Sequence, residues 1–169
     1  MKYSGIIFDD FAAAPGVSLT FFTQGCPHRC KGCHNSETWD FNGGLDFTEK
    51  VVDKIDNYIE KNNIVRNFCL MGGEPLCKEN LYLSCFLIDH IKTYHPKSPI
   101  YIWSGYTYQE LLEMNNNTIN HILQHADYLI DGRYIEELRD ITLSLRGSSN
   151  QKIINLQNKE KYDIIKWKI

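Results

Sequence analysis

Short runs rich in β-branched and aromatic residues alternate along this chain with segments of helical periodicity. The β-rich runs lie at residues 17–23, 67–71, 99–103 and 126–130. Strands that alternate with helices form βαβ units with parallel strands and right-handed crossovers. We therefore expect an α/β fold in which one domain forms an open or partial (β/α) barrel. Four clear βα units are too few for a full eightfold barrel, which takes about 250 residues.

Four helices are predicted between these runs. The clearest follows Asp46, which has capping-box spacing to Glu49. Its apolar face comprises Val51, Val52, Ile55, Tyr58 and Ile59. A second helix is predicted over residues 79–94, with a buried stripe of Leu83, Phe86, Leu87, His90 and Ile91. A third begins at Thr107 with Glu110 as its capping-box partner, and a fourth spans residues 118–125.

Composition places the chain among ordinary globular proteins. It has 169 residues, of which 43% are hydrophobic and 23% charged, with a formal charge of −3. This excludes a disordered chain or a coiled coil and does not favour nucleic acid as a partner. We predict a single domain over residues 1–169. The last dozen residues carry no motif, and their lysines are expected to form a solvated face or to protect an edge strand.

No membrane-spanning segment or signal peptide is apparent, so we expect a cytoplasmic protein without a membrane partner. In a reducing cytosol the six cysteines are better explained as ligands, reactive thiols or buried apolar residues than as disulfides.

Three of these cysteines, Cys26, Cys30 and Cys33, follow the first β-rich run in a C-x3-C-x2-C pattern. The surrounding segment is polar, so packing does not explain three thiols within eight residues. Ligands of parallel α/β folds bind beyond the carboxyl ends of the strands, which is where this loop is expected. A loop that wraps a metal centre fits the pattern.

Three kinds of centre compete for this loop. Zinc, with His28 or His34 as the fourth ligand, is disfavoured because structural zinc sites usually pair two separate short knuckles. A redox dithiol is disfavoured because a third cysteine precedes the C-x-x-C pair. A 4Fe–4S cluster normally takes four cysteines, and three would leave one iron open for catalysis.

The C-x3-C-x2-C spacing resembles the signature of the radical S-adenosylmethionine superfamily. The resemblance implies a 4Fe–4S cluster on Cys26, Cys30 and Cys33, with S-adenosylmethionine bound at the open iron. It also implies reductive cleavage of that cofactor to a 5′-deoxyadenosyl radical, chemistry that belongs to the cofactors. Many members carry an adenine-stacking aromatic residue just before the third cysteine, where this chain has Gly32.

A second motif of the same superfamily follows the next β-rich run. Gly72, Gly73 and Glu74 open the segment GGEP, which by itself could be an ordinary tight turn. In the superfamily this segment lies one βα unit after the cysteines and receives the amino group of S-adenosylmethionine. Glycines allow close approach to main-chain carbonyls, and a carboxylate adds a charged acceptor.

Later loops supply weaker cofactor-binding candidates. Ser104 follows the third β-rich run, and Asp131 follows the fourth, next to Arg133, whose guanidinium suits either a surface ion pair or a carboxylate ligand. The polar patch at 146–151, with Ser148 and Asn150, suits ribose hydroxyls and an adenine edge. Cys69 and Cys85 are expected to be ordinary buried thiols. Cys77 lies just past the GGEP segment, near the expected site, but we do not expect it to be a ligand.

The segments IWSGYTYQELL, DYLIDGRYIEELRD and LRGSSNQKI narrow the resemblance. Together they are similar to the activating components of anaerobic (class III) ribonucleotide reductases. That resemblance implies hydrogen abstraction from a glycine of the reductase large subunit, with a reduced flavodoxin-like electron donor. The alternatives are an activase of another glycyl radical enzyme, such as a formate lyase, a radical enzyme acting on a small molecule, and a non-catalytic zinc module.

Overall fold

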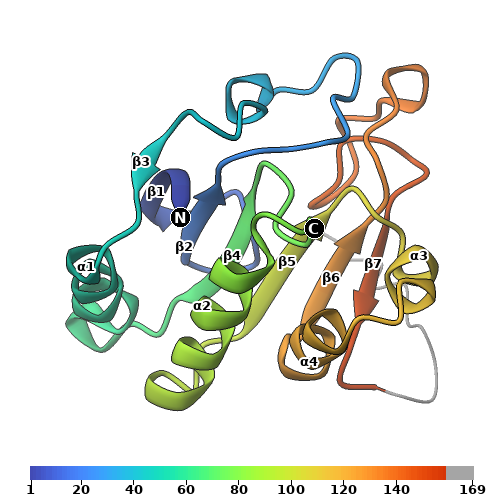
Figure 1. The fold of residues 1–169 in the computed structure, drawn as a ribbon. Helices are drawn as coiled ribbons and strands as arrows, with labels where there is room; N and C mark the ends of the chain where they lie inside the picture. The colour runs from blue at the N-terminus through green and yellow to red at the C-terminus, as the bar shows by residue number, and fades with distance from the viewer. Residues whose placement is uncertain (159–169) are drawn as a thin grey trace.

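One seven-stranded mixed sheet organises the molecule, in the order β3-β1-β2-β4-β5-β6-β7 (Figure 1). This computed structural model describes residues 1–158. Strands β2, β4, β5 and β6 are parallel, and β1, β3 and β7 pair antiparallel at the two sides. The strands are β1 (Lys2–Asp10), β2 (Ser18–Thr23), β3 (Leu45–Asp46), β4 (Asn67–Gly72), β5 (Ile100–Ser104), β6 (Tyr128–Asp131) and β7 (Lys152–Asn155).

The helices form the crossovers between the parallel strands. They are α1 (Glu49–Ile59), α2 (Leu81–Tyr94), α3 (Tyr108–Glu113) and α4 (Asn117–His125). Short 3-10 turns occur at Ser36–Thr38, Lys61–Asn63 and Glu136–Leu138. Figure 1 shows α1, α2 and α4 gathered on one face of the sheet. Because each crossover helix runs back along the sheet, the loops that follow the parallel strands share one edge.

The strand side chains alternate between two faces, as the period of two requires. Phe68 and Leu70 of β4 pack with the helices in the main hydrophobic cluster, whereas Cys69 and Met71 belong to a smaller cluster on the other face. That second cluster is formed by strand residues together with the loop residues Ala13, Ala14 and Leu145. The main core therefore lies between sheet and helices, and loops cover the other face.

The four parallel strands and the α/β class predicted from the sequence are confirmed, with boundaries shifted by a few residues. The sheet is not closed, and three antiparallel strands make it mixed rather than parallel. Strands β1, β3 and β7 lie outside the four predicted β-rich runs.

Two local predictions were wrong. Asp46 does not cap α1: it pairs with Lys2 at 2.9 Å, and Thr48 occupies the N-cap position without a side-chain cap bond. The buried stripe of α2 is also rotated from the predicted one. Phe86 is 38% exposed, while Ser84 and Ile88 are buried. The Ser84 hydroxyl can be buried because it donates to the Pro75 carbonyl at 2.7 Å.

The capping box of α3 is present as predicted, with Thr107 and Glu110 exchanging both bonds. The prediction for the C-terminal lysines concerns residues 159–169 and lies outside the described residues. Within residues 1–158, every helix is too short or too polar to cross a membrane.

Candidate active site

A cavity of about 790 Å³ opens where the loops beyond the parallel strands meet the face of the sheet that carries no helix. Its wall includes seven residues predicted from the sequence: Cys26, Cys30, Cys33, Gly72, Gly73, Glu74 and Ser104. Phe22, Met71 and Trp103, which point away from the helices, form part of its floor. The two sequence motifs, some forty residues apart, are thus brought into one site.

The cysteine loop is fixed to the rest of the molecule at its two ends. Gly25 N–H donates to the Thr38 carbonyl at 2.7 Å, and Cys26 N–H donates to the Trp39 carbonyl at 3.2 Å. Between these anchors the chain turns through positive φ at Arg29 (49°) and Gly32 (76°). Such left-handed residues curl a loop tightly. The three cysteines are free and face one cavity.

The GGEP loop packs directly against this cysteine loop. Gly73 N–H donates to the Thr23 carbonyl at 2.9 Å, and Glu74 N–H donates to the Gly25 carbonyl at 2.8 Å. A Cβ on Gly73 would overlap the Gly25 carbonyl, so only glycine allows this approach. The side chain of Asn80 also donates to the Gly25 carbonyl, at 3.1 Å, and to the Glu74 carbonyl, at 3.0 Å. The two motifs therefore form one rigid unit.

The Glu74 carboxylate is 1% exposed and lies at the centre of a hydrogen-bond network. Its Oε1 accepts from Leu76 N–H at 2.9 Å and from the Ser104 hydroxyl at 2.8 Å. Its Oε2 accepts from Gly105 N–H at 2.6 Å and from His28 Nε2 at 2.9 Å. A carboxylate has about four acceptor sites, and four donors fill them. This carboxylate ties the cysteine loop, the GGEP loop and the loop after β5 together.

His28 is held between a carboxylate and a guanidinium. Its Nδ1 accepts from Arg133 Nε at 3.1 Å, and arginine can only donate. The ring proton must then lie on Nε2, which faces Glu74. The ring also packs edge-on against Tyr106, and a Cβ on Gly105 would overlap it. His28, whose side chain is 5% exposed, is thus a buried positioning residue.

Three other predicted residues lie outside the cavity wall. Both oxygens of Asp131 accept from backbone N–H groups, of Tyr108 at 2.8 Å and Lys152 at 3.2 Å. The Ser148 hydroxyl accepts from Ile135 N–H at 3.2 Å. Asn150 donates to the Arg133 carbonyl at 2.8 Å. These side chains shape the outer loops around the cavity.

Seven further residues of the cavity wall were not assigned to the site from the sequence: Asp10, Ala12, Ala13, Tyr134, Glu136, Arg139 and Ile141. Arg146 and Gln151, the two ends of the predicted polar patch, also line the cavity. Tyr134 lies against Gly32, because a Cβ at position 32 would come within 3.3 Å of its ring and overlap Glu136. Tyr134 also donates to Glu136 at 2.5 Å. The segment DGRYIEELRD was recognised in the sequence, but nothing local showed that it folds over the cysteines.

Burial raises the pKa of the Cys26 thiol, an effect that a hydrogen bond from the backbone of His28 only partly offsets. Burial and the neighbouring Cys33 raise the pKa of Cys30. Thiols must lose their protons to bind metal, so loading this loop releases protons. Burial also raises the pKa of Cys69 and of Cys77 to about 12. Neither of these two, nor Cys85, lines the cavity.

Comparison with known proteins agrees with this arrangement. Residues 12–154 match a family described as a 4Fe-4S single cluster domain. The chain is 37% identical over 154 residues to the anaerobic ribonucleoside-triphosphate reductase-activating protein of Vibrio cholerae, covering 90% of this chain and 97% of the relative. The protein of that name from Escherichia coli K12 is 35% identical over 158 residues, covering 93% of this chain and 100% of the relative. The one from Enterobacteria phage T4 is 32% identical over 153 residues, covering 90% of this chain and 93% of the relative.

Proposed function

The chain belongs to the family of anaerobic ribonucleoside-triphosphate reductase-activating proteins, and from this premise we propose that it forms a glycyl radical on the large subunit of such a reductase. The observation that carries the proposal is the meeting of three free thiols and the GGEP loop in the wall of one open cavity. Its volume of about 790 Å³ lies in the usual range for a small-molecule cofactor.

Cys26, Cys30 and Cys33 are the residues that would hold a 4Fe–4S cluster. Their fit rests on the free thiols, the shared cavity and the tightly fixed loop. Three thiolates leave one coordination position open, as a catalytic metal site requires. When bound, the cluster and S-adenosylmethionine supply the one-electron chemistry that yields a 5′-deoxyadenosyl radical.

Gly72 and Gly73 would receive the amino group of S-adenosylmethionine through their carbonyl oxygens. The Glu74 carboxylate, buried and with four donors, contributes by fixing this loop and by its negative charge rather than by direct contact. His28 and Arg133 hold that carboxylate in place from the other side. Arg139 and Arg146 in the cavity wall are cations suited to the carboxylate of the cofactor.

The rim of the cavity suits a protein substrate. Ile141 lines the cavity and is 84% exposed, and Phe11, between the lining residues Asp10 and Ala12, is 74% exposed. Leu138, on the 3-10 turn of the outer loop, is also exposed. Exposed apolar residues in the wall of a site, or adjacent to it in the chain, indicate a docking surface. We assign this rim to the glycine-bearing part of the reductase.

Three finer features complete the proposal. The open sheet is a shortened barrel of the radical S-adenosylmethionine type, supported by its four parallel strands and by the cavity at their carboxyl edge. A reduced flavodoxin-like protein supplies the electron. The protein works in the reducing cytoplasm, which fits its six free cysteines.

The test is an anaerobic reconstitution followed by three measurements. We expect about four irons per chain, 5′-deoxyadenosine after addition of S-adenosylmethionine and a reductant, and a glycyl radical signal by electron paramagnetic resonance when the reductase is added. Cys26→Ala, Cys30→Ala and Cys33→Ala should each abolish cofactor cleavage. Cys85→Ala, the same change on α2 outside the cavity, should not.

Retained cleavage in any of the three loop variants would refute the cluster assignment. A colourless protein that holds zinc and cleaves nothing would replace the enzyme with a structural metal module. A radical signal on a formate lyase, and none on the reductase, would keep the chemistry and change the partner. Activation supported by the chemical reductant but not by reduced flavodoxin would refute the electron donor alone.

A further inference from the structure

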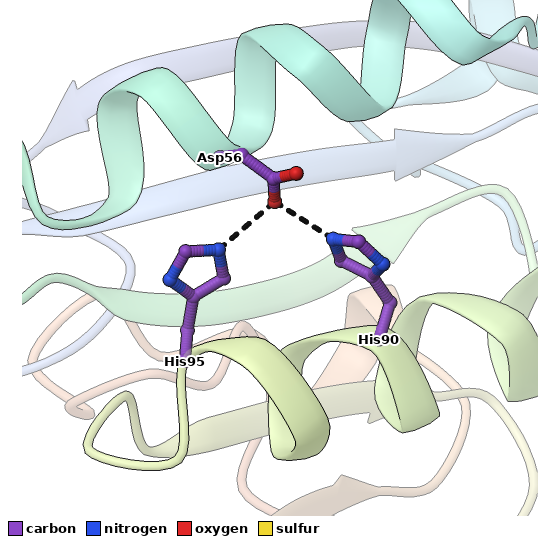
Figure 2. Close-up of side chains that lie close together, drawn as sticks. All are labelled: Asp56, His90 and His95. Carbon is purple, nitrogen blue, oxygen red and sulfur yellow. Dashed lines mark hydrogen bonds and ion pairs between the residues drawn. The ribbon is translucent and has the colours of Figure 1, made fainter.

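Two imidazoles and a carboxylate converge between α1 and α2. Asp56 belongs to the last turns of α1, His90 lies on α2, and His95 is the C-cap residue directly after α2. Figure 2 shows both rings directed at the carboxylate of Asp56. Nε2 of His90 lies 2.7 Å, and Nε2 of His95 2.9 Å, from the same oxygen, Oδ1. The three potential ligand atoms lie within 4.8 Å of one another.

This cluster is remote from the cavity described above. Helix α2 begins just after the GGEP loop at the carboxyl edge of the sheet and has 14 residues. A helix of that length spans about 21 Å, so its end lies towards the opposite edge. The cluster therefore does not belong to the cysteine site and is independent of the proposed function.

The electrostatic surroundings favour a cation at this point. Both helices end here, α1 at Ile59 and α2 at Tyr94, and helix C-termini carry partial negative charge. Asp56 and Glu60 add two carboxylates. Burial alone would raise the pKa of Asp56, but the hydrogen bonds from His90 and His95 outweigh it and hold that pKa below its ordinary value.

The rings are already oriented as metal ligands usually are. Nδ1 of His95 lies 3.4 Å from Oε1 of Glu60, on the side of the ring opposite Asp56. A ligand histidine commonly donates its second ring N–H to a carboxylate, and Glu60 is placed to accept from Nδ1 of His95 once Nε2 binds the metal in place of Asp56. The His90 ring lies nearly parallel to Phe86 at 5.9 Å and packs against Tyr94 at 4.7 Å, which limits its rotation.

We propose that Asp56, His90 and His95 form a binding site for a divalent transition-metal ion, with zinc as the best match, that clamps α1 to α2. Two imidazole nitrogens and one carboxylate oxygen are typical zinc donors, and water would complete a tetrahedral set. Metal–ligand distances of about 2.0–2.1 Å place tetrahedral donor atoms about 3.3 Å apart. The present N···O separations of 2.7 and 2.9 Å need to open by only about half an ångström.

The site is reachable from solvent, because the side chain of Asp56 is 38% exposed while those of both histidines are 12% exposed. An ion bound only by the folded chain stabilises it by mass action. At a zinc concentration 100-fold above the dissociation constant, the unfolding temperature should rise by about 5–10 °C.

The first experiment titrates ZnCl2 into the anaerobic, cluster-loaded protein by isothermal titration calorimetry. We expect one saturable site with a micromolar or lower dissociation constant. His90→Gln and His95→Gln keep a hydrogen-bond donor for Asp56 but remove a metal ligand, and each should weaken binding by more than about 100-fold. Glu60→Gln, which loses only the orienting carboxylate, should weaken it about 10-fold.

His121→Gln is the matched control. His121 lies on α4 and forms, with Cys85 and Asp89 of α2, a second group of potential ligands within residues 1–158. This variant should bind zinc as the unaltered protein does. Asp56→Asn provides a further ligand variant should either glutamine variant fail to fold.

Zinc K-edge absorption identifies the ligands directly. The proposal requires a shell of nitrogen and oxygen at about 2.0–2.1 Å and no sulfur shell near 2.3 Å. A sulfur shell would assign the ion to cysteine, in the cavity loop or at Cys85, and would overturn the proposal. No saturable binding at millimolar zinc, or unchanged affinity in both glutamine variants, would also overturn it.

Discussion

Replacing Glu74 by glutamine tests the central element of the site, because it changes one oxygen to an amide nitrogen at nearly constant volume. The carboxylate is buried and accepts four hydrogen bonds, two on each oxygen. A glutamine side chain accepts hydrogen bonds only at its amide oxygen, because the amide nitrogen is a donor. We therefore expect a large loss of folding stability as well as weaker S-adenosylmethionine binding.

The size of the stability loss depends on which of the four donors to Glu74 can find a new acceptor in the glutamine variant. The amide oxygen is best placed at the Oε2 position, where it keeps Gly105 N–H and His28 Nε2. The amide nitrogen then faces Ser104, whose hydroxyl can turn to accept, and Leu76 N–H, which is left without an acceptor. The opposite orientation of the amide is less favourable, because its nitrogen would face Nε2–H of His28. That proton cannot move to Nδ1, since Nδ1 accepts from Arg133.

One buried donor without an acceptor costs about 1–3 kcal/mol, and the change of two charged bonds to neutral ones adds about 1 kcal/mol each. The expected loss is therefore about 3–5 kcal/mol. With a urea m-value of about 2–3 kcal/mol/M, the unfolding midpoint should fall by about 1–2 M.

The assay is urea unfolding of the reduced, iron-free protein under anaerobic conditions, followed by circular dichroism. Glu79→Gln is the matched control, because Glu79 is exposed five residues further along the same segment. Its midpoint should stay close to that of the unaltered protein. If Glu74→Gln shifts the midpoint no more than Glu79→Gln does, the carboxylate is not the buried acceptor described here, and its part in fixing the two loops is refuted.

Three further predictions concern other buried groups. Asp131→Asn should lower the free energy of unfolding by about 1–3 kcal/mol, because each carboxylate oxygen accepts a backbone N–H; an unchanged urea midpoint would contradict this. Arg66→Lys should lower the free energy of unfolding by about 1–3 kcal/mol in the same assay. The Arg66 guanidinium binds Asp9 through two nitrogens and donates to two backbone carbonyls, which a lysine ammonium cannot reproduce; an unchanged urea midpoint would show that these contacts are not needed for stability. With pKa values raised to about 12, Cys69 and Cys77 should remain protonated thiols at pH 8 and react with iodoacetamide far more slowly than a solvent-exposed free cysteine does. Peptide mass spectrometry of the folded protein measures this, and rapid labelling of either thiol would refute the burial.

The elements with strong local signals were predictable. The four parallel strands follow from their apolar runs, and the capping box at Thr107 is present as expected. The same spacing at Asp46 wrongly predicted a capping box for α1, because Lys2 on the neighbouring strand binds the Asp46 carboxylate. Phe86 was assigned to the buried face of α2, but it packs edge-on against Phe47 and stays partly exposed. Both errors come from partners far away in the sequence.

The candidate site also has features that the sequence predicts and features that depend on distant residues. Spacing identified the three cysteines, and the cavity does bring them next to Gly72, Gly73 and Ser104. The buried environment of Glu74 could not be predicted, since its four donors come from three separate loops. The positioning role of His28 also depends on Arg133, 105 residues away.

The strand order has a consequence for how this site is assembled. Apart from the short β3, each strand lies beside its neighbour in the chain. Such a sheet can be extended one strand at a time as the polypeptide leaves the ribosome. The three-cysteine loop and the GGEP loop are joined once β2 and β4 have paired, whereas the wall formed by Tyr134 and Arg146 arrives last. During synthesis, the thiols are therefore in place before the cavity around them is closed.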